Sequence, residues 1–133
     1  MTPAETLTMA QQLLDRADAK TASIWPRAAA LLARQALEQG LDEYWREKGV
    51  PLHDFGTRPQ LICLREYIGD AALGGRAHHT WAALSEACHH HPYELAPGHD
   101  ELKTWLGAVG ELLLQLTAHG SKSMRDAVEA RRP

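Results

Sequence analysis

Hydrophobic residues recur at helical spacing in five parts of the chain, and no part alternates apolar and polar residues with the period of two that is typical of a strand. The spacing predicts helices over residues 3–17, 24–48, 58–68, 76–91 and 100–119. We therefore expect an all-α fold, an up-and-down bundle of about five helices.

Capping residues and helix breakers suggest where these helices begin and end. Thr2-Pro3-Ala4-Glu5 and Thr57-Arg58-Pro59-Gln60 resemble capping boxes, and Ser23 precedes the second helix as a further cap. The predicted breakers are glycine and proline residues at Gly49-Val50-Pro51, Gly69, Gly74-Gly75, Pro92 and Gly120. The expected division is a single helical domain over 1–119 and a polar C-terminal tail over 120–133.

Composition and charge exclude several classes of protein. The chain has 133 residues, of which 44% are hydrophobic and 23% charged, so we exclude a wholly disordered chain. The formal net charge is −3, which argues against binding DNA through bulk positive charge. No signal peptide and no membrane span is predicted. Cys63 and Cys88 form no CxxC pair, so we expect reduced thiols in a cytoplasmic protein.

The second predicted helix carries a charged pair within its apolar arc. Arg34 and Glu38 are four residues apart, the spacing at which opposite charges bond across one helical turn. One interpretation is an internal ion pair at the edge of the core. The alternative is that Arg34 and Glu38 belong to a ligand site, in which the guanidinium binds a phosphate or a carboxylate.

The fifth predicted helix combines a core stripe with a flank of small residues. Gly107 and Gly110 lie on that flank beside Leu114, and each glycine costs about 1 kcal/mol relative to alanine in a helix. Close approach of another helix, from this chain or from a second subunit, would offset that cost. The stripe consists of Leu102, Trp105, Leu106, Val109, Leu112, Leu113 and Leu116.

The chain contains eight histidines, which suggests metal binding or acid–base chemistry. Three of them are consecutive, at residues 89–91, and on a continuous helix their side chains would point about 100° apart and could not converge on one metal ion. The weak metal candidates are Glu86 with His90, one turn apart, and Cys88 with His91. No third ligand follows from the spacing, although His53 and His99 lie in predicted loops, and we assign no cofactor. A polar stripe on the fourth predicted helix contains His78, Ser85 and His89. His78 is a candidate ligand-binding residue, and Ser85 with His89 is a candidate catalytic pair.

Two segments together resemble a known family. Residues 28–41, AAALLARQALEQGL, and residues 81–116, WAALSEACHHHPYELAPGHDELKTWLGAVGELLLQL, are similar to HEPN-like helical domains. The resemblance implies a helical bundle that is often dimeric. Its members include RNA-cleaving toxins and catalytically silent interaction or nucleotide-binding modules.

The resemblance also implies residue roles. Active members carry an arginine upstream of a histidine, with a polar residue between them. His89 matches the histidine and Ser85 the polar residue, but Leu84 stands at the arginine position, with Ala82 and Ala83 at the alternative spacings. Arg34 or Arg76 is left as a substitute from elsewhere in the fold.

We therefore favour a non-catalytic HEPN-like interaction module, one associated with nucleotides or RNA, in bacterial stress or phage defence. Its expected partners are a second copy, which would form a homodimer, and a protein from a neighbouring gene, with no membrane partner. The alternatives are a metal-independent endoribonuclease that uses His89, and a bundle that binds a small ligand or a metal.

Overall fold

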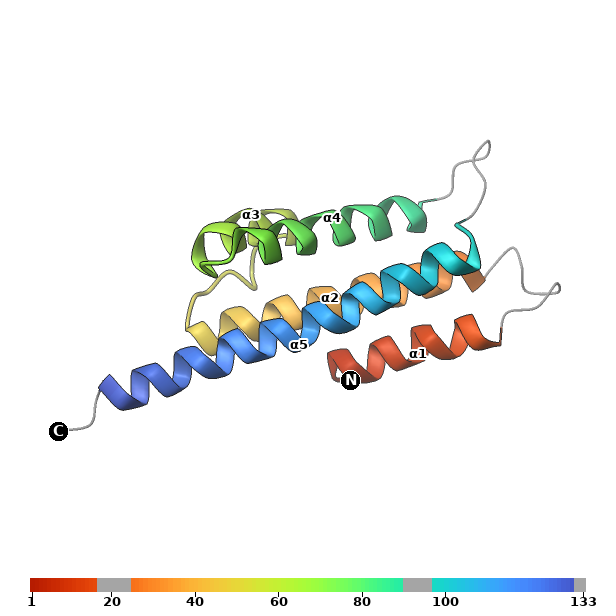
Figure 1. Ribbon diagram of the computed structural model, residues 1–133. Helices are drawn as coiled ribbons and strands as arrows, with labels where there is room; N and C mark the ends of the chain where they lie inside the picture. The colour runs from red at the N-terminus through yellow and green to blue at the C-terminus, as the bar shows by residue number, and fades with distance from the viewer. Residues whose placement is uncertain (17–24, 90–96, 131–133) are drawn as a thin grey trace.

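The computed structural model describes residues 1–16, 25–89 and 97–130, with side chains described as far as residue 120. Over these residues the chain forms five helices and no strand, which confirms the all-α prediction (Figure 1). The helices are α1 (Pro3–Asp15), α2 (Trp25–Lys48), α3 (Thr57–Tyr67), α4 (Ala71–Cys88) and α5 (His99–Ala130).

The ends of the first two helices follow their local sequence. Thr2 caps α1 by accepting a hydrogen bond from the Glu5 amide at 3.1 Å, while Glu5 accepts one from the Thr2 amide at 3.3 Å. This reciprocal arrangement confirms the first capping box. Helix α2 ends at Lys48 because Gly49 turns into the left-handed region, with φ of 71°. Ser23 lies outside the described residues.

The second predicted capping box is wrong. The residue that precedes α3 is Gly56, which has no side-chain cap, and Thr57 is the first residue of the helix. The Thr57 hydroxyl donates to Glu38 of α2 at 2.7 Å. The buried Gln60 amide donates to Asp42 of α2 and to the Phe55 carbonyl. Both polar side chains therefore attach α3 to its surroundings, and neither is used to cap it.

Helix α4 begins earlier than predicted and includes the glycine pair. Asp70 caps it by accepting from the Leu73 amide at 3.0 Å, so Gly74 and Gly75 lie inside the helix. Gly74 faces α3, where an added β-carbon would lie 2.8 Å from the Arg65 Cα atom. The prediction that this pair breaks the helix is wrong, since Gly74 permits close packing between α3 and α4. Gly69, with φ of 71°, does separate them.

The predicted ends of α4 and α5 are also wrong. Helix α4 stops at Cys88, and His89 has extended dihedral angles, φ −77° and ψ 137°. His90, His91 and Pro92 lie outside the described residues. Helix α5 continues through Gly120, at which an added β-carbon would meet the Glu47 carboxylate of α2. This glycine therefore accommodates a neighbouring side chain instead of ending the helix.

Helix α2 lies in the middle of the bundle and packs against α1, α4 and α5. Figure 1 shows α5 running along α2 and continuing past its end. The buried face of α2 is rich in small residues, which allow its neighbours to approach closely. Fully buried residues of this face are Ala29, Ala30, Ala33, Ala36, Leu37, Leu41 and Trp45. The stripe predicted for α5 packs opposite, with Trp105 and Leu113 half-buried at its edges.

The two adjacent glycines of α4 should respond oppositely to alanine. Gly74→Ala places a methyl group against the α3 backbone, so we expect unfolding to become easier by about 1–3 kcal/mol. Gly75→Ala meets nothing within 4 Å and removes backbone entropy from the unfolded chain. It should stabilise by about 0.5–1 kcal/mol. Urea denaturation of both variants measures the difference, and equal shifts would contradict the proposed contact.

Candidate functional site

The predicted charged pair on α2 is present. The Arg34 Nε atom lies 3.6 Å from the Glu38 Oε1 atom, and the two side chains are 25% and 32% exposed. The other carboxylate oxygen of Glu38 accepts the Thr57 hydroxyl, so Glu38 has partners on two helices. Arg34 and Glu38 therefore form the predicted ion pair, which helps to hold α3 against α2.

Cys88, at the end of α4, lies close enough to this pair to be affected by its charges. Burial raises the pKa of the Cys88 thiol above its usual value; the Arg34 charge opposes that rise and the Glu38 charge adds to it. A thiol with a raised pKa is largely protonated near neutral pH and is a poor nucleophile. The arrangement therefore favours an unreactive, structural thiol.

The predicted catalytic pair is not formed. The Ser85 hydroxyl is buried and has no hydrogen-bond partner, so it makes no bond to His89. His89 follows the last residue of α4 and has extended dihedral angles, so the helix ends there. Leu84 is fully buried in the core. His78 is half-buried on α4, two turns before Ser85.

The predicted metal pairs lie partly outside the described residues, because His90 and His91 are not among them. Within the part of the chain that the structure describes, no three His, Cys, Asp or Glu side chains gather as a metal site would require. Glu86 is exposed on α4, and its proposed partner His90 lies outside the described residues. The two loop histidines have other neighbours: the His53 Nε2 atom lies 3.5 Å from the Asp54 Oδ1 atom, and the His99 ring packs edge-on against Trp25.

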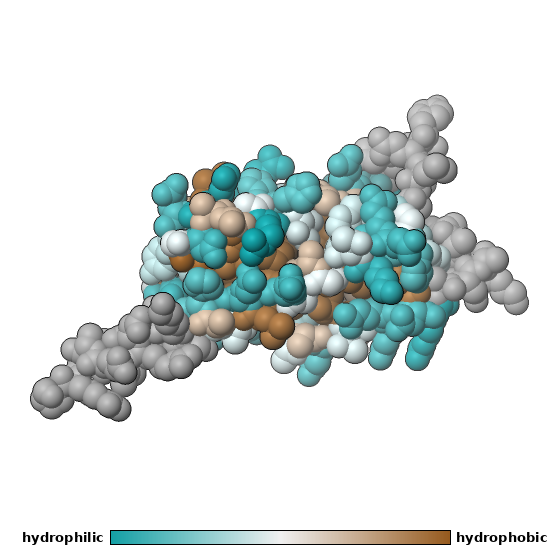
Figure 2. Space-filling model, viewed as in Figure 1, coloured by the Kyte–Doolittle hydropathy of each residue, from teal (hydrophilic) through white to brown (hydrophobic). Residues whose placement is uncertain are grey.

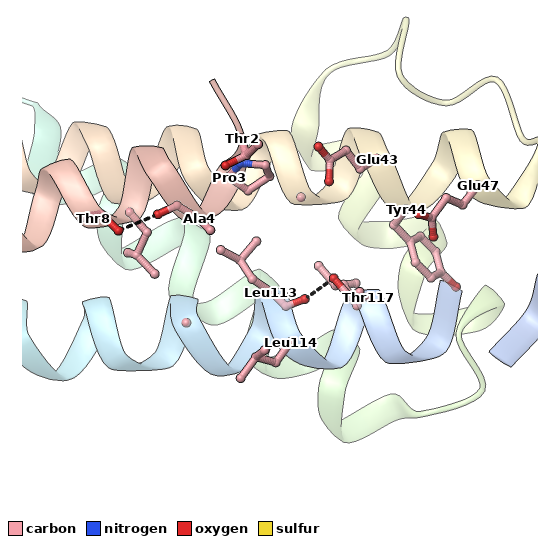
Figure 3. Close-up of a pocket in the computed structure, with 14 residues that line it drawn as sticks. Thr2, Pro3, Ala4, Thr8, Glu43, Tyr44, Glu47, Leu113, Leu114 and Thr117 are labelled. Atoms are coloured by element: carbon pink, nitrogen blue, oxygen red, sulfur yellow. Dashed lines mark hydrogen bonds between the residues drawn. The ribbon is translucent and has the colours of Figure 1, made fainter. Parts of the chain in front are cut away.

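The structure instead shows a cavity of about 440 Å³ between α1, α2 and α5. In Figure 3 the first turns of α1 lie across it from Leu113, Leu114 and Thr117 of α5. Its floor includes Gly40 and Gly110, and most of its lining is apolar. This volume is within the range of small-molecule and side-chain binding pockets.

The α2 side of the cavity is polar and acidic. Glu43 and Glu47, one helical turn apart and both exposed, border it beside Tyr44. The buried Tyr44 hydroxyl has no hydrogen-bond partner. Burial, with a smaller contribution from Tyr67, raises the pKa of Tyr44 to about 12, so the phenol stays neutral. The Lys48 ammonium lies 5.4 Å from the Tyr44 ring centroid, within the range of a cation–π interaction.

One wall of the cavity continues onto an exposed flank of α5. Leu114 is 74% exposed and borders the cavity. An added β-carbon at Gly107 would meet nothing within 4 Å, and one at Gly110 would make only an ordinary contact with Leu7, at 3.6 Å. Figure 2 shows apolar residues among the hydrophilic ones that cover most of this side of the molecule. We call Gly107, Gly110, Leu114 and the cavity the α5 face.

Comparisons with protein-family models, with curated proteins and with solved structures found no match to this chain. Within the described residues, no helix is both long enough and apolar enough to cross a membrane.

The sequence pointed to only part of this surface. Gly107 and Gly110 were noticeable in the sequence because glycines are unfavourable inside a helix, and Leu114 lies beside them on the same flank. Glu43, Tyr44 and Glu47 gave no comparable signal, because they join the cavity only when α2 packs against α5. A pattern along one helix does not reveal such a junction.

Iodoacetamide should modify Cys63 faster than Cys88 at pH 8, because Cys63 is exposed and the Cys88 thiolate is scarce. Glu38→Gln should speed modification of Cys88, since it removes a charge that raises the pKa. Arg34→Gln should slow it, and Glu43→Gln serves as the control without effect. Mass spectrometry of timed samples gives each rate. A change in the same direction for both charge variants would contradict the assigned electrostatics.

Proposed function

We propose that the chain is a non-catalytic interaction module of HEPN-like type, and that its partner on the α5 face is a second copy of itself. The observation that carries the proposal is the position of an exposed leucine, Leu114, directly beside an apolar cavity. In a two-fold dimer the same patch of each subunit faces its counterpart, so a projection and a hollow on one patch are self-complementary.

The glycines of α5 support close approach of a second helix. Within the described part of the chain, neither Gly107 nor Gly110 is needed for packing, because an added methyl group at either position would meet open space or an ordinary contact. Each still costs about 1 kcal/mol in helix stability relative to alanine. A helix that crosses α5 at these positions would gain contact with its backbone, which offsets that cost.

The residues assigned to catalysis support a binding role over a nuclease role. The RNA cleavage implied by the family resemblance uses a cation to stabilise the phosphate and a histidine as the acid–base group. Leu84 replaces the cation at the position implied by the family resemblance, and it is fully buried. Ser85 makes no hydrogen bond to His89. Arg34, the first possible substitute, is paired with Glu38.

A charge at the centre of the α5 face should abolish self-association. Leu114 is exposed, so Leu114→Glu should leave folding intact, whereas burial of its carboxylate in a dimer would carry a large desolvation cost. Sedimentation equilibrium should give a dimer for the natural sequence and a monomer for Leu114→Glu. Ile62→Glu, which changes an exposed apolar residue on α3, is the matched control and should remain dimeric. A monomeric natural protein, or a dimeric Leu114→Glu variant, would refute the proposal.

A further inference from the structure

A second hollow lies on the other flank of α5, where that helix packs against α4. Its volume is about 500 Å³, and it is lined mainly by apolar surface. Small residues make the space: Ala72 and Gly75 on α4, and Ala108 on α5. An added β-carbon at Gly75 would meet nothing within 4 Å. We call this hollow the α4–α5 groove.

The α4 wall of the groove carries positive charge. Arg76 lies there, one turn before His79. The Arg76 Nη2 atom donates to the Gln115 side-chain oxygen at 3.1 Å, and within the described residues no carboxylate lies within ion-pair distance of its guanidinium. A guanidinium has five N–H donors in a planar fork that matches a carboxylate. Arg76 therefore retains donors for an anion in the groove.

The α5 wall supplies an aromatic side chain and a buried leucine. Trp105 is half-buried, packs against the core and borders the groove, and the buried Leu112 lies two turns further along the same helix. An indole ring held in this way can pack against another aromatic ring. Thr80 and Thr104 add hydroxyl groups to the lining. The lining of the groove thus includes both a cation and an aromatic side chain.

Glu111 restricts the charge of the ligand. Its side chain borders the same groove from α5, so negative charge is present opposite Arg76. One anionic group can approach Arg76, but a dianion or a polyanion would also meet the Glu111 carboxylate. The overall charge of −3 acts in the same direction.

We propose that the α4–α5 groove binds an aromatic molecule that carries a single carboxylate. The carboxylate pairs with the Arg76 guanidinium, and the ring lies against Trp105. This site uses the flank of α5 opposite to the α5 face, so the proposal does not depend on dimerisation.

Three probes with one ring system test the chemistry. 2-Naphthoate carries one negative charge, 2-naphthalenemethanol none and 2-naphthyl phosphate up to two. Isothermal titration calorimetry of the full chain should give an affinity for 2-naphthoate at least about tenfold above those for the other two, which is the effect of about one charge-assisted hydrogen bond. Equal affinity for the alcohol, or tighter binding of the phosphate, would overturn the proposal.

Variants locate the site. Arg76→Gln should weaken 2-naphthoate binding about tenfold and leave the alcohol unchanged, because it removes the charge only. Gly75→Leu adds a side chain to the lining of the groove at a position where the β-carbon meets nothing within 4 Å, so it should fold and should weaken all three probes. Arg46→Gln, at an exposed arginine of α2, is the control that should bind as the natural chain does. Unchanged binding by Arg76→Gln or by Gly75→Leu would overturn the assignment.

Amide chemical shifts in the Leu114→Glu variant separate this inference from the proposed function. With 2-naphthoate they should change along α4 and α5 around Arg76 and Trp105, whether or not the chain dimerises. Changes confined to the α1 side of the cavity, around Pro3 and Leu7, would overturn the proposed site.

Discussion

The structure depends on how closely helices can approach α2. Its buried face carries four alanines, Ala29, Ala30, Ala33 and Ala36, and each is completely buried. Further along, Gly40 leaves space for Leu113 of α5. Side chains this small bring the helix axes together, and the contact area gained compensates for the modest apolar area of each alanine. Since α1, α4 and α5 all pack on α2, a large residue on its buried face would displace several helices at once.

Helix ends were predictable where the signal was purely local. Thr2 and Glu5 bond to each other, and Gly49 takes a backbone conformation that suits glycine, so neighbouring residues were sufficient evidence. Prediction failed where tertiary contacts gave the same residue types another role. Thr57 bonds to α2, and Gly74 and Gly120 admit groups from other helices. A glycine in the sequence can therefore indicate either a turn or a close approach between helices, and only the packing of the folded chain shows which of the two applies.

The same distinction explains how much of the candidate site could be foreseen. The Arg34–Glu38 pair lies on one helix, so spacing alone predicted it. The pairing of Ser85 with His89 was also predicted from spacing along one helix, and it failed because the buried Ser85 hydroxyl makes no hydrogen bond. The two hollows combine residues of separate helices: Pro3 with Leu113 in one, and Arg76 with Gln115 in the other. Hydrophobic periodicity describes one helix at a time. It can therefore identify the helix faces that line each hollow, but not which faces pack together to form it.

Helix α5 gives the molecule two sides of different electrostatic character. On its α1 side the cavity is bordered by Glu43 and Glu47, and basic residues are absent from its described lining. On its α4 side the groove contains Arg76 and His79, with Glu111 on the facing wall. An anionic group is thus repelled from the first hollow, whereas a single one can reach Arg76 in the second, although both hollows are mainly apolar. The net charge of −3 conveys none of this, because selectivity depends on where a few charges lie beside apolar surface. One rigid helix with its core stripe between the hollows is sufficient to keep the two sites apart.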